Sequence, residues 1–295
     1  MFYNIQSKQG HITQRQITRS RIPAHALSPC SALHPNHTPT PPKALPHMTH
    51  PPQVALIQGA SGGIGGALAA RALASGRFSR VILTSRDPQT SLPLTDERIT
   101  ALRLDLTSDD SIEEAAGRVR EVSGALHLVI TTAGLLHDEA RGITPEKSLN
   151  HLRRSSLQAL FDVNCAGPFL WYRALMPTFR HRDPLTIATL SARVGSISDN
   201  ELGGWYGYRA SKAAQNMMTK TLSLELRRVN PNATVVGLHP GTVQTPLSEP
   251  FHGRVPASQL LTPARSAEAL WGVLEGLSPA QSGRCFAWDG AEVLP

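Results

Sequence analysis

Cysteine is scarce in this chain. Its 295 residues include only Cys30, Cys165 and Cys285. These are too few and too scattered for a disulfide framework, and no Cys-x-x-Cys pair offers zinc ligands or a redox couple. We therefore expect no metal centre and no disulfide-stabilised fold. A reducing compartment, the cytoplasm, is the expected location.

Long apolar runs are absent as well. The sequence has no uninterrupted apolar window of about 18 residues, whereas a membrane-spanning helix needs about 20. A secretory signal also requires an apolar core. We expect no transmembrane helix, no secretory segment and no membrane association.

Acidic residues are missing from the first 50 positions. Residues 1–50 contain no Asp or Glu, five Lys and Arg, six His and a proline-rich run from Pro35 to Pro46. Such a composition buries too little apolar surface to offset its ordering entropy. The sequence predicts a disordered basic extension over 1–50 and a folded domain over 51–295. Two alternatives are a mitochondrial transit segment, given the acid-free composition, and an upstream extension that ends before Met48.

The net charge of +7 comes mostly from this extension. Without its five cations, 24 Lys and Arg remain against 22 Asp and Glu. The predicted domain lacks the basic stripe with interleaved aromatics that nucleic-acid binding requires. Nucleic acid is therefore not an expected partner.

From Gln53 onward, short aliphatic runs alternate with longer amphipathic runs, the pattern of repeated βα units. Strands are predicted at 54–58, 81–84, 101–104, 126–131, 185–190, 234–239 and 284–288. Helices are predicted at 63–75, 111–122, 145–180 with a break, 206–229 and 263–277. The expected fold is α/β: a doubly wound, Rossmann-like parallel sheet of about seven strands in a single domain, with helices on both faces. Ligands of such sheets bind at the carboxyl ends of the strands.

The first predicted strand leads into GASGGIGG at 59–66 and then a helix. Glycines at a helix start let backbone N–H groups approach a pyrophosphate, whose charge the helix dipole favours. The same residues match the Gly-x-Ser-x-Gly nucleophile elbow of hydrolases. That motif requires strands before it, however, and here the loop follows the first strand. Ser61 is interpreted as a loop hydroxyl that bonds backbone or phosphate.

The end of the second predicted strand bears on the choice of dinucleotide. An NAD-binding protein has an acid about 20 residues after the glycine loop, where this chain has Ser85 followed by Arg86. A planar guanidinium suits a 2′-phosphate, so NADP(H) is preferred over NAD(H). The alternative is that Arg86 is a solvated surface residue paired with Asp87.

Tyr208 and Lys212 stand four residues apart near the start of a predicted helix, so their side chains share a face. A phenol with a pKa of about 10 is a poor proton donor or base at neutral pH, and a nearby ammonium with an oxidised nicotinamide stabilises its anion. By chance, such a pair also occurs as a surface cation beside an aromatic ring. It gains weight here because it follows a dinucleotide loop and a strand that ends before Ser191.

Several motifs in this order resemble the short-chain dehydrogenase/reductase family over residues 53–290. They are Gly59-x-x-x-Gly63-Ile64-Gly65, Asp105, TTAG at 131–134, Asn164, Ser191, Tyr208-x-x-x-Lys212 and Pro240-Gly241-Thr242-Val243-x-Thr245. Within the family, SARVGS at 191–196 and GGWYGY at 203–208 resemble the branch of C-factor-like and sniffer-like carbonyl reductases.

The resemblance implies roles for these residues. Tyr208 would donate a proton to the carbonyl oxygen, Lys212 would lower the phenol pKa and hold the nicotinamide ribose, and Asn164 would position a water that relays protons. Asp105 is expected at the adenine and Thr245 near the carboxamide. The full set of expected cofactor contacts is Gly59, Ser61, Gly63, Ile64, Gly65, Arg86, Asp105, Leu106, Ala133, Gly134, Tyr208, Lys212, Pro240, Gly241, Val243 and Thr245.

Two positions depart from the family pattern. Thr131 and Thr132 stand where Asn-Asn is common, and their hydroxyls are expected to bond backbone. Ala192 stands where the second, catalytic serine of Ser-Ser-x-x-Gly is common. Ser191 is then the preferred catalytic serine, with Ser196 or a site without a serine as alternatives.

The sequence thus predicts an NADP(H)-dependent carbonyl reductase acting on an aldehyde, ketone or quinone. The alternative is a slow or non-catalytic cofactor-binding regulatory protein of the C-factor type. The segments 160–177 and 210–226 are apolar around more of a helix than one buried face requires. A homodimer or homotetramer formed through these helices is therefore expected.

Overall fold

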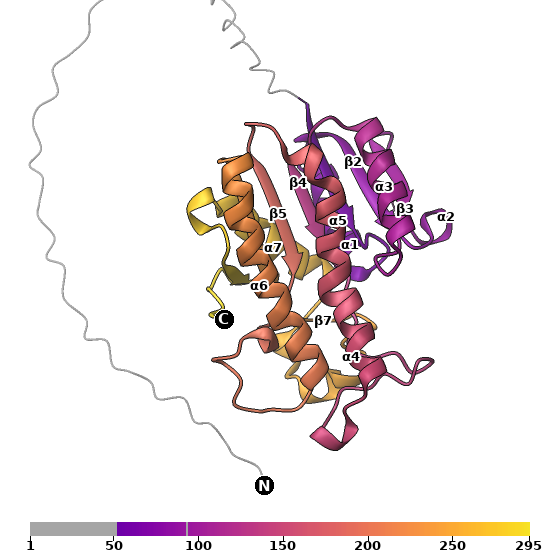
Figure 1. Cartoon of the computed structure of the whole chain (residues 1–295), viewed down its shortest axis with the longest axis vertical. Helices are drawn as coiled ribbons and strands as arrows, with labels where there is room; N and C mark the ends of the chain where they lie inside the picture. Colours follow the sequence, from indigo (N-terminus) through magenta and orange to yellow (C-terminus); the bar gives the residue numbers. More distant parts are fainter. Residues whose placement is uncertain (1–51, 93) are drawn as a thin grey trace, which may run out of the picture. The chain divides into compact units, whose positions relative to one another are not determined.

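Seven strands form one parallel sheet in the computed structural model, which describes residues 52–92 and 94–295 (Figure 1). They are β1 (Gln53–Gln58), β2 (Phe78–Ser85), β3 (Ile99–Arg103), β4 (Leu128–Thr131), β5 (Leu185–Leu190), β6 (Ala233–His239) and β9 (Cys285–Ala287). The spatial order is β3-β2-β1-β4-β5-β6-β9, so the winding reverses between β1 and β4. The predicted doubly wound, Rossmann-like fold and its seven strands are confirmed. The prediction of a disordered extension over 1–50 lies outside the described residues.

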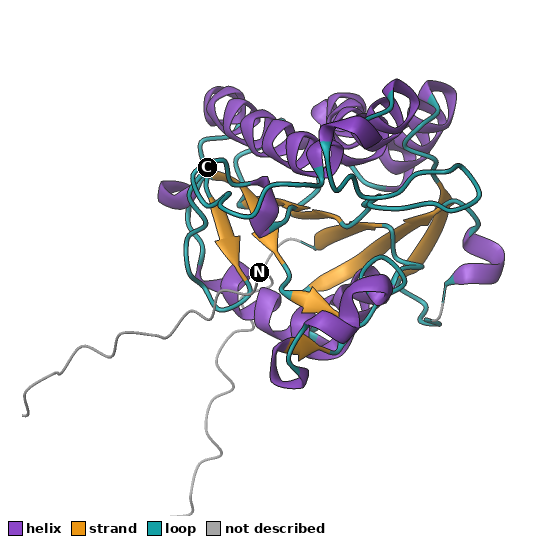
Figure 2. Ribbon diagram, turned by 90° about the horizontal axis from the view of Figure 1, so that it is seen from below, coloured by secondary structure: helices purple, strands orange, loops and turns teal. Residues whose placement is uncertain are grey.

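Helices cover both faces of the sheet (Figure 2). One face carries α3 (Asp109–Val122), α5 (Gly167–Leu175) and α6 (Tyr206–Val229). The other carries α1 (Gly63–Ala74) and α7 (Pro263–Gly276). The remaining α-helices are the short α2 (Pro88–Ser91) and α4 (Arg154–Phe161), and β7 (Thr242–Val243) pairs with β8 (Leu260–Leu261) outside the main sheet. Every helix within the described part of the chain is too short or too polar to span a bilayer.

Alternation along β1 explains the two helical layers. Leu56 is fully buried against the layer of α3, α5 and α6, whereas its neighbours Ala55 and Ile57 are buried against α1 and α7. Successive side chains of a strand point to opposite faces, so an uninterrupted apolar run requires cover on both sides. The carboxyl ends of the strands are left as the edge where a ligand can bind.

The predicted helix over 145–180 is divided more than the sequence indicates. A 3₁₀ turn at Leu149–His151 comes first, α-helix begins only at Arg154 (α4), and residues Asp162–Ala166 form a π-helical turn before α5. Residues 145–153 do not continue the helix, because Glu146 accepts a hydrogen bond at its carbonyl oxygen from Trp205 N (2.6 Å). The segment is thus joined to the start of α6 and not to α4.

Candidate active site

The glycine loop links β1 to α1. Gly59 has a left-handed φ of 80°, and a Cβ at Gly65 would collide with the carbonyl oxygen of Gly59. The loop therefore folds back tightly only because both positions are glycine. Gly62 precedes α1 without a side-chain cap, and the first turn has no acid. The first N–H groups of a helix lack intrahelical partners, so this end of α1 suits an anion.

Two further segments border the glycine loop. Thr132 donates its hydroxyl to the Gln58 carbonyl (2.8 Å), and Ala133 N donates to the Gln58 side chain (3.1 Å). As expected from the sequence, the Thr132 hydroxyl bonds backbone. The same expectation for Thr131 is wrong, because its buried hydroxyl bonds no backbone group among the described residues. On the other side, the Thr245 methyl group lies against Gly63.

The predicted cofactor residues therefore gather at the carboxyl edge of the sheet. Gly59, Ser61, Gly63, Ile64 and Gly65 come from the loop after β1, and Ala133 and Gly134 from the loop after β4. Pro240, Gly241, Val243 and Thr245 follow β6. Gly241 adopts a left-handed φ of 79°, as the turn between β6 and β7 requires.

Arg86 and Asp105 lie at the ends of β2 and β3. Arg86 is exposed and Ser85 is buried. Burial alone would raise the pKa of Asp105, but hydrogen bonds from the amide and hydroxyl of Thr107 and the nearby charge of Arg86 outweigh it, so the net shift is downward. Leu106, which was predicted to contact the cofactor, is 7% exposed and part of the core with α3 and α5.

Tyr208 and Lys212 occupy the first two turns of α6. The Lys212 Nζ lies 6.0 Å from the centre of the Tyr208 ring. It donates to the carbonyl of Leu190 at the end of β5 (2.7 Å) and to the side chain of Gln215 (3.1 Å). The helix thus brings the predicted phenol and ammonium together at the carboxyl edge of the sheet.

Both groups are buried, and burial shifts both pKa values. Loss of water lowers the pKa of Lys212 to about 7 and raises the pKa of the Tyr208 phenol above its usual range, because burial disfavours a charged form. The structure therefore holds Tyr208 protonated at neutral pH. The lowering of its pKa expected from Lys212 is not seen, since burial dominates.

Asn164 lies in the π-helical turn and is fully buried. Its Oδ1 accepts from Leu135 N (2.7 Å), and its Nδ2 donates to Leu135 O (2.8 Å) and to Ser211 Oγ (3.0 Å). The side chain thereby joins the loop after β4 to α6 between Tyr208 and Lys212. Single π turns often occur at functional sites, and this one directs an amide to the site.

Neither candidate serine is bonded to Tyr208. Ser191 donates to Asn216 Oδ1 (2.6 Å), and Ser196 Oγ accepts from Asp199 N (3.1 Å). From the turn after β5, Ala192 and Val194 pack in the apolar cluster around Tyr208. The structure therefore does not bring Ser191 or Ser196 to the phenol, because the chain turns after β5 and directs Ala192 there.

Sequence reasoning missed an aromatic group beside Tyr208. The Trp205 ring lies 6.2 Å from the Tyr208 ring, edge to face, and 4.8 Å from the Phe251 ring between centroids. Trp205, Phe251 and the apolar side chains of Leu136, Ala192 and Leu247 pack together around the phenol, and leave Tyr208 only 7% exposed.

Trp205 has an unusual backbone. It is the only non-glycine residue in the described part of the chain with a left-handed φ, 52°, and it follows Gly203 and Gly204, which share this conformation. Such a conformation costs about 1–3 kcal/mol for a non-glycine residue and is found most often at functional sites. The two glycines were the available sequence signal, but they do not reveal that the strain extends to Trp205.

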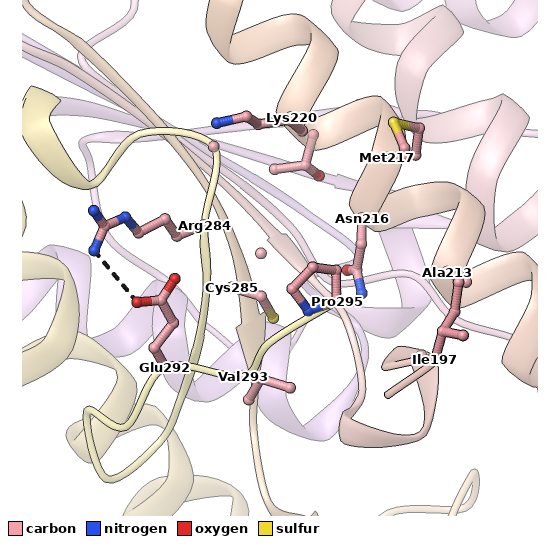
Figure 3. A pocket seen from close by; sticks show the side chains of 14 residues that line it. Ile197, Ala213, Asn216, Met217, Lys220, Arg284, Cys285, Glu292, Val293 and Pro295 are labelled. Carbon is pink, nitrogen blue, oxygen red and sulfur yellow. Dashed lines mark hydrogen bonds and ion pairs between the residues drawn. The ribbon is translucent and has the colours of Figure 1, made fainter. Parts of the chain in front are cut away.

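A separate cavity of about 490 Å³ lies between α6 and the C-terminal segment. Figure 3 shows Asn216 of α6 next to Pro295, with Cys285 and Val293 close by. None of its lining residues belongs to the glycine loop or is Tyr208. We therefore assign the reaction to the carboxyl edge of the sheet and not to this cavity.

The order of these features matches a known family. The sequence profile of the short chain dehydrogenases matches residues 53–254, a stretch that includes the glycine loop, Asn164, Tyr208 and Lys212. The chain belongs to the short chain dehydrogenase family. The predicted resemblance is confirmed, and the chain is an oxidoreductase by family, with a fold that binds nicotinamide cofactors.

Relatives and solved structures agree with this assignment. The chain is 33% identical over 187 residues to the 1-hydroxy-2-glutathionyl-2-methyl-3-butene dehydrogenase of Rhodococcus sp. (strain AD45), covering 63% of this chain and 76% of that protein. It is 35% identical over 147 residues to C-signal of Myxococcus xanthus, covering 50% and 82%. The NADPH-bound carbonyl reductase from chicken fatty liver has a TM-score of 0.70 at 26% identity, covering 82% of this chain and 98% of that one.

Proposed function

We propose that this chain is an NADP(H)-dependent carbonyl reductase that acts on an aldehyde, ketone or quinone. The observation that carries the proposal is the position of Tyr208 and Lys212 on successive turns of α6, joined through Ser211 and Asn164 to the loop that borders the glycine loop. A proton donor and a dinucleotide cradle thus meet at one edge of the sheet.

The residues present fit a dinucleotide. The glycine loop leaves the start of α1 open because Gly63 carries no side chain, and a Cβ there would fill the gap toward Thr245 and Pro263. Gly59, Ser61, Gly63, Ile64 and Gly65 would hold the pyrophosphate, and Ala133, Gly134, Pro240, Gly241, Val243 and Thr245 would line the nicotinamide half. A reduced nicotinamide bound there supplies a hydride to the carbonyl carbon.

The chain's own residues supply the proton and the surroundings. Tyr208 is protonated at neutral pH, so its hydroxyl can give a proton to the carbonyl oxygen. Burial raises its pKa, so the transfer requires Lys212 and the bound cofactor to stabilise the phenolate. Lys212, next to it, would hold the nicotinamide ribose and offset the negative charge left on the phenol. The apolar cluster around Tyr208 excludes water from the reacting atoms. With Ala192 in place of a serine, we propose that the substrate oxygen is held by Tyr208 alone.

Arg86 supports NADP(H) over NAD(H). It is exposed at the end of β2, close enough to Asp105 to influence the pKa of that carboxyl. An arginine there can form paired hydrogen bonds to a 2′-phosphate. The chicken carbonyl reductase to which the chain is similar is described as NADPH-bound.

A second candidate is a regulatory protein that binds the cofactor and turns over slowly. Ala192 in place of a serine and the 35% identity to C-signal favour it. The intact Tyr208, Lys212 and Asn164 favour the enzyme. Tight NADPH binding without turnover of any carbonyl would support the regulatory role.

The test is oxidation of NADPH by the purified chain with a panel of aldehydes, ketones and quinones. Tyr208→Phe should leave the Kd for NADPH nearly unchanged and lower kcat by at least about a hundredfold, because it removes the proton donor and keeps the ring. A variant that retained most of the activity would contradict the role assigned to Tyr208.

A further inference from the structure

An aromatic cap lies beside Tyr208. The Tyr208 residue is 7% exposed, and the aromatic cap, by which we mean Trp205 and Phe251, packs in the same apolar cluster. A carbonyl oxygen must come within hydrogen-bond distance of the Tyr208 hydroxyl to take its proton. A substrate ring that also stacks on the indole needs one ring of the cap to move, and the contacts of the two rings identify which.

Trp205 is the fixed side. The backbone N–H of Trp205 donates to the Glu146 carbonyl (2.6 Å), and the Glu146 carboxylate accepts from Gly207 N (3.3 Å). The guanidinium of Arg209 donates to the carbonyls of Gly204 (3.0 Å), Gly203 (3.2 Å) and Val194 (3.4 Å). These hydrogen bonds fix the backbone of the left-handed turn on both sides, so the indole is held in place before a substrate binds.

Phe251 is the ring of the aromatic cap that a substrate can displace. It lies in the irregular connection between β7 and β8, on the short 3₁₀ segment Glu249–Arg254. The described ring contacts of Phe251 are with the indole and with His137, whose centroid lies 6.4 Å away. Displacing Phe251 would expose the face of Trp205 next to Tyr208.

We propose that Trp205 determines specificity: a flat, uncharged aryl carbonyl takes the place of the Phe251 ring on the indole and presents its oxygen to Tyr208. This inference rests on the proposed function. An aryl ring can replace the aromatic contact that Phe251 loses, whereas a saturated ring of the same size cannot. The surrounding side chains Leu136, Ala192, Val194 and Leu247 are apolar, and a charge brought among them would lose its hydration without a partner.

Matched substrates distinguish the effect of the ring from that of the carbonyl group. Benzaldehyde and cyclohexanecarbaldehyde differ in ring saturation, and their kcat/KM ratio with NADPH defines the aryl preference. Benzamide and cyclohexanecarboxamide are analogues that hydride does not reduce, so their Kd values in the presence of NADP⁺ report on the ring site without turnover.

Two variants should change binding of the aryl ring in opposite directions. Trp205→Gly keeps the left-handed turn, which glycine adopts without strain. It should lower the kcat/KM ratio of benzaldehyde to cyclohexanecarbaldehyde about fivefold, or about 1 kcal/mol. The preference for benzamide over cyclohexanecarboxamide, measured as the ratio of their Kd values, should fall by the same factor. Phe251→Ala removes the ring that competes for the indole and should tighten benzamide binding about threefold. Tyr206→Ala is the control, because Tyr206 is 42% exposed on the same helix start and lies outside the aromatic cap; its aryl preference should match the wild type.

The Tm and the Kd for NADPH of each variant verify folding. An unchanged aryl preference in Trp205→Gly, or weaker benzamide binding in Phe251→Ala, would overturn the proposal. If the wild type reduced neither aldehyde but bound benzamide in a Trp205-dependent way, the result would support the aryl site at Trp205 and contradict the proposed carbonyl reductase activity.

Discussion

Lys212 gives the protein a pH dependence of stability with a definite sign. Its pKa falls from 10.5 to about 7 on burial. Between these values the unfolded chain binds more protons at this position than the folded chain, so the free energy of unfolding should rise with pH above about 7. The slope from this one group is at most about 1.4 kcal/mol per pH unit. Urea unfolding of the cofactor-free protein at pH 7, 8 and 9 should show this rise.

Lys212→Met is the matched variant, since it keeps an unbranched apolar stem and cannot titrate. Its unfolding free energy should change less with pH over the same interval. Equal slopes for the two proteins would mean that Lys212 is charged in the folded state at pH 8.

Arg86 should decide between the two dinucleotides. Arg86→Ala should weaken NADPH binding by about 1.5–3 kcal/mol, the range for hydrogen bonds to charged groups, and change NADH binding little. Fluorescence titration with each cofactor measures both values. An equal loss for NADPH and NADH would remove the 2′-phosphate argument.

At the scale of elements, Asn164 connects the π turn between α4 and α5 to the loop after β4. Asn164→Ala would leave the amide and carbonyl of Leu135 without their side-chain partner, at a cost of about 2–3 kcal/mol in unfolding free energy. Gln158→Ala is the control, because Gln158 is exposed on α4 and bonds only the Asp162 side chain among described partners. A loss no larger in Asn164→Ala than in the control would contradict the assigned role.

The strands were predictable, as was most of the middle helix, but the start of that helix was not. The run 185–190 (LTIATL) is rich in aliphatic and β-branched residues and is of strand length, so its composition and its length both predict a strand. The span 145–180 is apolar at helical spacing, but that pattern cannot reveal that Glu146 bonds Trp205 and Gly207, some 60 positions away. Such long-range hydrogen bonds override local propensity.

At the scale of the whole molecule, the part of the site that follows strand ends or a helical repeat could be predicted. Tyr208 and Lys212 are one helical turn apart, and the glycine loop directly follows a strand. The orientation of Ser191 toward Asn216 depends on how the chain turns after β5. The aromatic cap depends on a left-handed residue and on a loop 46 positions away, and neither has a period that sequence can show.

Association of two copies remains our expectation. On α6, the apolar side chains of Met217, Met218 and Leu224 are 66%, 41% and 42% exposed, and burial of such a patch in a symmetric pair would stabilise a dimer. Light scattering during size-exclusion chromatography at micromolar protein should give twice the chain mass or a multiple of it. Met217→Glu combined with Leu224→Glu should give the mass of one chain. A wild-type monomer with full activity would contradict the expected assembly.

Helix α6 is 24 residues long. It carries Tyr208 and Lys212 at its start and the exposed patch of Met217, Met218 and Leu224 farther along. If copies pair through the patch, we expect the partner to restrain α6 and the site residues at its start. Turnover per molecule would then depend on how much protein is present, and activity would fall on dilution below the dissociation constant of the pair. The abundance of the protein in its compartment would itself set how active each copy is.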